Sequence, residues 1–338
     1  MIVIGSEWEG RPLVEACYRA IVERGGHPLI RLEFPELTEF FLRNASTSQL
    51  QFVPPTAFFE AESAAARIRI AAESDTRGMI RVDPSRQVLV DRAREPLRKA
   101  SRRQRWVVTQ YPTTAFAADA GMGLEEYEAF VVSAMYLDRA DPVLAWKELG
   151  TRQTGLVEYM TTVKKVRIEA EETDITLSVA GRTWINSDGR RNMPSGEIFT
   201  GPEEVSAQGK LRCGFPVCRD GRELIGIELV FDRGCVISAR AQEGEDYLLS
   251  MLDLDAGSRR LGELGLGLNY GISRFSGSIL YDEKIGGTVH LALGQSYPET
   301  GGVNESALHW DLIVDTRTSG RITADGQVVM EDGVWRVG

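Results

Sequence analysis

Histidine and cysteine are both scarce in this sequence, which holds three histidines and four cysteines among 338 residues. Cys213 and Cys218 are spaced in a way that could hold a metal. A structural zinc centre needs a second pair of ligands nearby, however, and the surrounding sequence has none. The sequence therefore predicts free thiols in a reducing compartment rather than a zinc–thiolate centre.

Long apolar runs and an excess of basic residues are also missing. No apolar stretch approaches the ~20 residues that span a bilayer, and the segment Met1–Gly5 has neither the basic region nor the cleavage site of a signal peptide. The net charge is −10, from 49 acidic and 39 basic residues, which argues against a nucleic-acid partner. We expect a cytoplasmic protein that binds neither membranes nor nucleic acid.

The first 145 residues alternate predicted strands with predicted helices. We expect strands at Met1–Gly5, Pro28–Leu32, Arg67–Ala71 and Trp106–Gln110, and helices at Pro12–Arg24 and Pro84–Arg103. This order is typical of a parallel sheet covered by helices, so we predict an α/β domain over residues 1–145. The early glycines do not form G-x-G-x-x-G, so a dinucleotide-binding fold is not supported.

The pattern of the second half is different. An amphipathic helical pattern runs from Gly123 to about Thr162, and we assign residues 146–165 to a helical linker. Beyond it the chain is rich in strands and turns, with strands expected at Val166–Ala170, Asp174–Val179, Leu224–Phe231 and Val236–Arg240 and a helix at Gly244–Leu252. We predict an α+β, strand-rich metal-binding catalytic domain over residues 166–338, because the notable acidic and histidine positions lie there.

The most informative stretch is His309-Trp310-Asp311, within a run in which apolar and other residues alternate as in a half-buried strand. Residues i and i+2 of a strand share a face with Cα atoms roughly 6–7 Å apart, a suitable reach for an imidazole and a carboxylate to grip one cation or two adjacent ones. A second histidine, His290, occupies a similar strand 19 residues earlier. This placement of two scarce histidines suggests a metal site.

Two glutamates extend the set. Glu263 has Gly265 and Gly267 as its same-face neighbours, and glycine in a strand often marks the close approach of another group. Glu197 follows directly after a Pro/Gly turn. Each alone is more commonly a solvated residue, and a lone histidine is more commonly hydrogen-bonded than metallated. Together they supply nitrogen and oxygen ligands without thiolate, a set that suits Zn, Co or Mn. Two such cations would lower the pKa of a shared water and polarise a carbonyl, as in aminopeptidases.

Four ordered segments resemble the aminopeptidase T family, a family of two-metal leucyl-type aminopeptidases first associated with thermophiles. They are Trp184–Glu197, Gly262–Asn269, Glu283–Gly294 and His309–Asp311. The resemblance implies a pair of divalent cations, with Glu197, Glu263, His290, His309 and Asp311 as ligands. It also implies an active-site tyrosine at Tyr297, seven residues after His290, and a tendency toward homodimers.

We therefore predict a metallo-aminopeptidase that hydrolyses the N-terminal peptide bond of a peptide, by default one with a hydrophobic first residue. Tyr297 or a cation would stabilise the oxyanion, and Glu283 would shuttle the proton. Glu283 could equally orient a ligand or pair with Lys284. The rival enzyme is a mononuclear Fe(II) ring-cleaving dioxygenase of hydroxypyridines that uses only His290, His309 and Asp311. A non-catalytic binding protein on the same fold is a further alternative.

Overall fold

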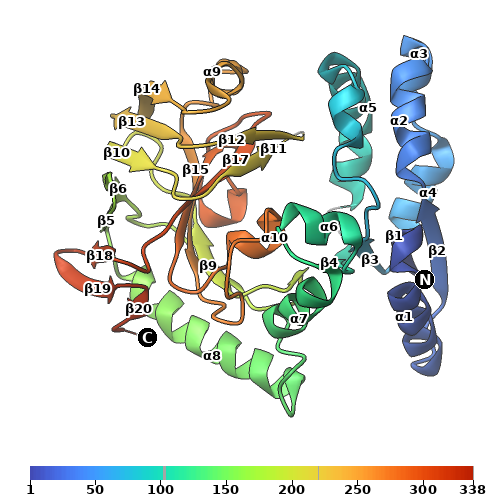
Figure 1. The fold of residues 1–338 in the computed structure, drawn as a ribbon, viewed down its shortest axis with the longest axis horizontal. Helices are drawn as coiled ribbons and strands as arrows, with labels where there is room; N and C mark the ends of the chain where they lie inside the picture. Colours follow the sequence, from blue (N-terminus) through green and yellow to red (C-terminus); the bar gives the residue numbers. More distant parts are fainter. Residues whose placement is uncertain (102–103, 220, 338) are drawn as a thin grey trace. The chain divides into compact units, whose positions relative to one another are not determined.

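The computed structural model describes residues 1–101, 104–219 and 221–337, and its backbone divides into two compact units (Figure 1). The first unit comprises Met1–Glu128 together with Arg190–Met193. The second comprises Ala129–Gly189 and the described chain from Pro194 onward. Helix α7 (Leu124–Ala134) begins in the first unit and ends in the second.

The first unit is built on a parallel five-stranded sheet in the order β2-β1-β3-β4-β8. Its strands are β1 (Ile2–Glu7), β2 (Pro28–Glu33), β3 (Ala66–Ala71), β4 (Arg105–Gln110) and β8 (Asn192–Met193). Its helices are α1 (Arg11–Glu23), α2 (Pro35–Asn44), α3 (Thr47–Leu50), α4 (Pro55–Ser63), α5 (Pro84–Ser101) and α6 (Thr114–Asp119). The predicted α/β architecture is confirmed. The helix predicted at Pro84–Arg103 is α5, and its predicted end at Arg103 lies outside the described residues.

The second unit holds two antiparallel sheets of different size. The larger has the order β14-β13-β10-β6-β5-β18-β19-β20. Its strands are β5 (Lys165–Ala170), β6 (Thr173–Ser178), β10 (Gln208–Arg212), β13 (Glu228–Asp232), β14 (Cys235–Arg240), β18 (Arg321–Ala324), β19 (Gln327–Glu331) and β20 (Val334–Trp335). The smaller has the order β17-β16-β15-β9-β7. It contains β7 (Ile185–Ser187), β9 (Glu197–Thr200), β15 (Leu261–Gly267), β16 (Val289–Gly294) and β17 (His309–Val314).

A short hairpin and three helices complete this unit. The hairpin pairs β11 (Val217–Arg219) with β12 (Arg222–Leu224), and the helices are α8 (Pro142–Thr161), α9 (Glu245–Leu252) and α10 (Ile279–Asp282). One hydrophobic core joins residues of both sheets, such as Ile168 and Leu291, with residues of α8 and α9, such as Leu156 and Leu248. The strand-rich second half is thus as predicted.

One predicted strand is wrong. Leu224–Phe231 is not continuous, because the chain leaves β12 and re-enters a strand only at β13. Gly226 lies between them with φ +65°, a left-handed conformation that interrupts a strand and that glycine adopts easily. A Cβ there would lie 2.6 Å from the side chain of Gln242, so the turn is closely packed as well as tightly bent.

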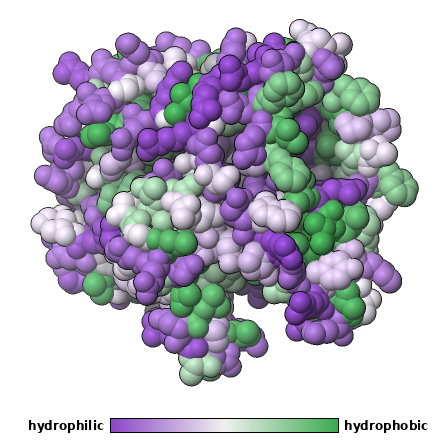
Figure 2. Space-filling model, turned by 45° about the vertical axis from the view of Figure 1, so that its right-hand side comes forward, coloured by the Kyte–Doolittle hydropathy of each residue, from purple (hydrophilic) through white to green (hydrophobic). Residues whose placement is uncertain are grey.

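The surface of the first unit carries several exposed large apolar side chains. Leu37, Phe40, Phe52 and Phe59 are each more than 60% exposed. Figure 2 shows apolar side chains gathered in patches among polar ones on one face of the molecule. Exposed apolar patches of this kind commonly mark contact surfaces for other proteins.

Among the helices in the described part of the chain, none is long and apolar enough to cross a bilayer.

Candidate metal centre

The candidate ligands lie on one face of the small antiparallel sheet. Its register pairs Gly267 of β15 with Glu197 of β9, and Gly265 of β15 with His290 of β16. Ala292 pairs with Glu263 on one side and Asp311 on the other, and Gly294 pairs with His309. Since paired residues in adjacent strands project from the same face, all five predicted ligands emerge together. The opposite face is apolar and packs into the core.

The glycine next to Glu263 has a specific steric cause. A Cβ on Gly265 would lie 1.9 Å from both Cε1 and Nε2 of His290, far inside van der Waals contact. The His290 ring therefore lies over the bare backbone of β15. The expectation that a close-approaching group explains this glycine is confirmed, and the group is the imidazole itself.

Three overlapping sets of side chains bring their ligand atoms within 4.8 Å of one another: Glu197, Glu263 and His290; Glu263, His309 and Asp311; and Glu283, His290 and Asp311. Nε2 of His290 lies 3.4 Å from Oε2 of Glu197 and 3.6 Å from Oε1 of Glu263. Nε2 of His309 lies 3.3 Å from Oε2 of Glu263 and 3.7 Å from Oδ1 of Asp311. Glu263 is therefore shared by two neighbouring sets.

These donors suit divalent cations. Oε2 of Glu197, Nε2 of His290 and Oδ1 of Asp311 are buried and have no hydrogen-bond partner among the described residues. Buried polar atoms are rarely left in that condition unless something else satisfies them. Imidazole and carboxylate ligands at these positions match the preferences of Zn, Mn or Co.

The pKa values of the side chains in the site also favour the binding of divalent cations. Burial raises the pKa of Glu197 to about 7 and that of Asp311 to about 6. Burial also disfavours the charged form of Glu263, but the adjacent imidazoles of His290 and His309 outweigh it and lower the Glu263 pKa to about 2. Burial opposes the protonation of both histidines, and the adjacent carboxylates nevertheless raise their pKa values to about 10. A divalent cation would replace those protons.

Glu283 and a buried lysine stand at the edge of this centre. Glu283 caps α10 and accepts a hydrogen bond from Nζ of Lys284, whose side chain is fully buried. The same Nζ lies 3.6 Å from Oε1 of Glu197. Burial opposes the charge on Lys284, but Glu197 and Glu283 raise its pKa above the usual range. Glu283 is thus close to His290 and Asp311 and also paired with Lys284, so both roles considered for it remain compatible with its position.

Tyr297 follows β16 and lies beside His309, one of the candidate ligands. Its ring centroid is 5.2 Å from that of His309, in an edge-on arrangement, and 5.4 Å from that of Phe199. The residue is 38% exposed. The phenol is therefore held at the rim of the centre by two ring contacts, and burial together with the neighbouring carboxylates raises its pKa.

Two residues that support candidate ligands were not identified from the sequence. Nδ1 of His309 is 2.9 Å from the carbonyl oxygen of Gln295, which leaves Nε2 directed at the carboxylates. Nε2 of Gln153, on α8, donates to the Glu197 carbonyl oxygen at 2.8 Å. Gln153 and Glu197 are 44 residues apart, and a single glutamine in a helical pattern carries no sequence signal for such a contact.

Comparison with known proteins identifies relatives of the same kind. Aminopeptidase 2 of Geobacillus stearothermophilus is 30% identical over 268 residues, which cover 68% of this chain and 65% of that protein. Aminopeptidase T of Thermus thermophilus is 27% identical over 259 residues, which cover 68% of this chain and 62% of that protein. The chain thus spans slightly less than two thirds of the length of these relatives.

Two solved structures share the fold. AmpT from Thermus thermophilus superposes with a TM-score of 0.86 at 23% identity, covering 99% of this chain and 94% of that one. A dihydroxypyridine dioxygenase from Pseudomonas putida KT2440 superposes with a TM-score of 0.63 at 15% identity, covering 99% and 91%. The family model described as thermophilic metalloprotease (M29) matches residues 1–335. The resemblance to aminopeptidase T is confirmed, and this chain belongs to the thermophilic metalloprotease (M29) family.

Proposed function

We propose that this protein is a metal-dependent aminopeptidase that hydrolyses the N-terminal peptide bond of peptides. The observation that carries the proposal is the convergence of Glu197 and Glu263 with both histidines and Asp311 on one sheet face. Membership in a metalloprotease family and similarity to proteins named aminopeptidases support it.

Glu197, Glu263 and His290 would hold one cation, and Glu263, His309 and Asp311 a second. When bound, such cations supply Lewis acidity and lower the pKa of water. Their identity is proposed as Zn, Co or Mn from the ligand chemistry. Glu263, as the shared member of both sets, fixes the two positions relative to each other.

The remaining polar side chains supply proton transfer and substrate positioning. The phenol of Tyr297 lies beside His309 and would donate a hydrogen bond to the oxygen that becomes negatively charged in the transition state. The carboxylate of Glu283 would accept the proton of the attacking water and pass it to the leaving amine. Lys284 holds Glu283 in place for this transfer through their ion pair.

The rival is a dioxygenase that uses one iron held by His290, His309 and Asp311. Such an enzyme needs only two histidines and one carboxylate, so Glu197 and Glu263 would have no function in it. In this structure both glutamates lie within 3.6 Å of His290 Nε2. The shared fold with a dioxygenase therefore does not favour that chemistry here.

Elemental analysis of protein purified without chelator distinguishes the two enzymes. We expect about two Zn, Co or Mn ions per chain, together with release of nitroaniline from aminoacyl-nitroanilides. Glu263→Gln should abolish the binding of the second ion and the peptidase activity, because Glu263 belongs to both proposed ligand sets. About one Fe per chain, with oxygen-dependent turnover of a hydroxylated pyridine, would instead establish the dioxygenase.

We further propose a cytoplasmic homodimer. Leu37, Phe40, Phe52 and Phe59 of the first unit are exposed apolar side chains, and protein partners commonly cover such groups. The thiols of Cys17, Cys213 and Cys235 form no disulfide in the described part of the chain, which suits a reducing compartment. Light scattering coupled to size-exclusion chromatography tests the dimer, and a monomer at micromolar concentration would contradict it.

A further inference from the structure

An ion pair lies against the loop that carries Tyr297. Arg182 belongs to the segment before β7, and Glu204 belongs to the turn after β9. Nη2 of Arg182 donates to Oε2 of Glu204 at 2.6 Å, and the two side chains are only 11% and 17% exposed. Neither residue belongs to the candidate ligand sets found among the described residues, so the pair has some other role.

Both partners of the Arg182–Glu204 pair also bond to the backbone of the loop. Nη1 of Arg182 donates to the carbonyl oxygen of Gly301, and Oε1 of Glu204 accepts a hydrogen bond from the N–H of Val303 at 2.8 Å. Gly301 has φ +85°, a left-handed conformation that bends the chain. The pair therefore holds the backbone on both sides of a bend that lies shortly after Tyr297.

Further hydrogen bonds connect this bend to Tyr297 itself. The hydroxyl and the N–H of Thr300 both donate to the carbonyl oxygen of Tyr297, at 2.6 Å and 3.0 Å. The carbonyl oxygen of Thr300 accepts from the N–H of Thr183 at 2.9 Å, next to Arg182 in the chain. A Cβ on Gly201 would lie 2.7 Å from the Thr300 hydroxyl, so the turn after β9 packs closely on the same loop. The position of the Tyr297 backbone thus depends on the ion pair.

The phenol of Tyr297 needs this support because its ring is only partly enclosed. The residue is 38% exposed and contacts the rings of Phe199 and His309. These contacts fix the side of the ring but bond to no atom of the backbone. A displacement of about 1 Å in a group that acts on the transition state can cost about 10²-fold in rate. An oxyanion donor on a loop therefore has to be held by its backbone as well as by its ring.

We propose that Arg182 and Glu204 are positioning residues that hold the loop of Tyr297, and with it the phenol, at the metal centre. This inference rests on the proposed aminopeptidase function, in which Tyr297 stabilises the oxyanion. Because the pair acts through the tyrosine, its loss should lower kcat while KM and metal content stay nearly unchanged.

A double-mutant cycle tests this role, since two residues that act through one interaction have non-additive effects. Glu204→Ala removes both acceptor oxygens, so we expect kcat for leucyl-nitroanilide to fall at least fivefold with KM within twofold. In a Tyr297→Phe background the same change should lower kcat less than twofold. Arg182→Lys keeps the charge, but one ammonium group cannot reach both Gly301 and Glu204, so it should give the same pattern.

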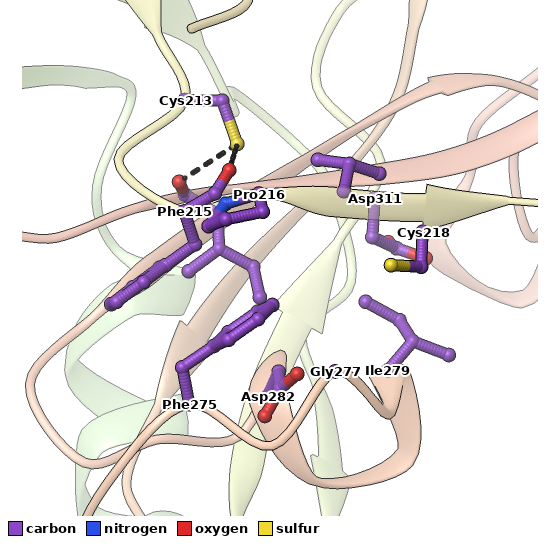
Figure 3. A pocket seen from close by; sticks show the side chains of 11 residues that line it. Cys213, Phe215, Pro216, Cys218, Phe275, Gly277, Ile279, Asp282 and Asp311 are labelled. Atoms are coloured by element: carbon purple, nitrogen blue, oxygen red, sulfur yellow. Dashed lines mark hydrogen bonds between the residues drawn. The ribbon is translucent and has the colours of Figure 1, made fainter. Parts of the chain in front are cut away.

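A second ion pair of the same kind provides the matched control. Asp315, directly after β17, accepts hydrogen bonds from the N–H, Nε and Nη2 of Arg317 at 2.7–3.0 Å. Arg317 lies over the ring of Phe215, which lines a small pocket together with Asp311 (Figure 3). This pair is thus also near the centre but does not bond to the loop of Tyr297. Asp315→Ala should change kcat by the same factor in both backgrounds.

Hydrogen exchange supplies a readout that does not depend on turnover. Backbone amides of residues 297–303 should exchange at least tenfold faster in Glu204→Ala than in the parent, and within twofold of the parent in Asp315→Ala. Equal losses of kcat in both backgrounds of an active enzyme would overturn the positioning role alone. So would exchange in Glu204→Ala as slow as in the parent. A metal-loaded parent that cleaves none of the substrates would overturn the proposed function, and the positioning role with it.

Discussion

Position 265 accommodates only glycine, because the imidazole of His290 occupies the space that a Cβ there would fill. We predict that Gly265→Ala displaces the His290 ring, since the added Cβ would lie 1.9 Å from two of its atoms. The metal content should fall by about one ion per chain, and kcat/KM at least tenfold. Gly123→Ala is the control, because a Cβ there would meet no other atom of the described residues within 4 Å. Equal metal content in both variants would contradict the prediction.

Tyr297 is predicted to act through its hydroxyl rather than its ring. Tyr297→Phe keeps the ring contacts with His309 and Phe199 but removes the donor, so kcat should fall roughly 10²-fold, as for loss of an oxyanion donor, with unchanged metal content. Tyr270→Phe is the matched control, since its hydroxyl donates to the Gly333 carbonyl oxygen instead. An unchanged kcat in Tyr297→Phe would remove this residue from the mechanism.

At the scale of elements, the carboxylate of Asp255 bonds to both loops that precede β15 and β17, the strands of the candidate ligands Glu263, His309 and Asp311. Asp255 lies shortly before β15 and accepts hydrogen bonds from Gly257 N–H and Ser258 Oγ within its own loop. It also accepts from Ser306 Oγ at 2.8 Å and Ala307 N–H at 2.7 Å, shortly before β17. Burial opposes its charge, but these bonds lower the pKa of Asp255. The carboxylate thus fixes the entry to both strands.

This arrangement predicts a pH-dependent stability. Because the folded-state pKa of Asp255 is lowered, its contribution is complete above the unfolded-state value and is lost as pH falls through the folded value. Asp255→Asn should cost about 1 kcal/mol at pH 7, a low figure because the carboxylate is only partly buried, and nothing at strongly acid pH. Urea titrations at several pH values measure this. Glu305→Gln, in the loop before β17 that Asp255 contacts, is the control, and a cost independent of pH would argue against the ionic contribution.

At the scale of the whole molecule, we expect metal binding at the candidate centre to be coupled to folding. Its buried carboxylates lie close together, so the folded protein should be more stable with cations bound. Metal at 100 times its dissociation constant adds about 2.7 kcal/mol per site. We therefore expect chelator-treated protein to gain several degrees in Tm when Zn, Co or Mn is restored, as measured by calorimetry.

His27, the third histidine of the sequence, provides the control for this measurement. His27→Ala should retain the metal-dependent rise in Tm, because His27 belongs to none of the candidate ligand sets found among the described residues. His290→Ala should lose most of it. A rise of the same size in both variants would mean that the stabilising cations bind elsewhere.

The sequence by itself determined the parallel α/β first half and the strand-rich second half, and its family motifs singled out the five candidate ligands. That these five residues share one face of one antiparallel sheet came from the structure. The sequence did not predict the helices between Pro35 and Ser63 or the break at Gly226, where local conformation departs from simple periodicity. Only the tertiary structure decided that Lys284 is buried against Glu197 and Glu283, that Gln153 supports Glu197, and that a pocket adjoins Asp311. These contacts join segments through side-chain packing, and the order of residues along one chain carries no record of such proximity.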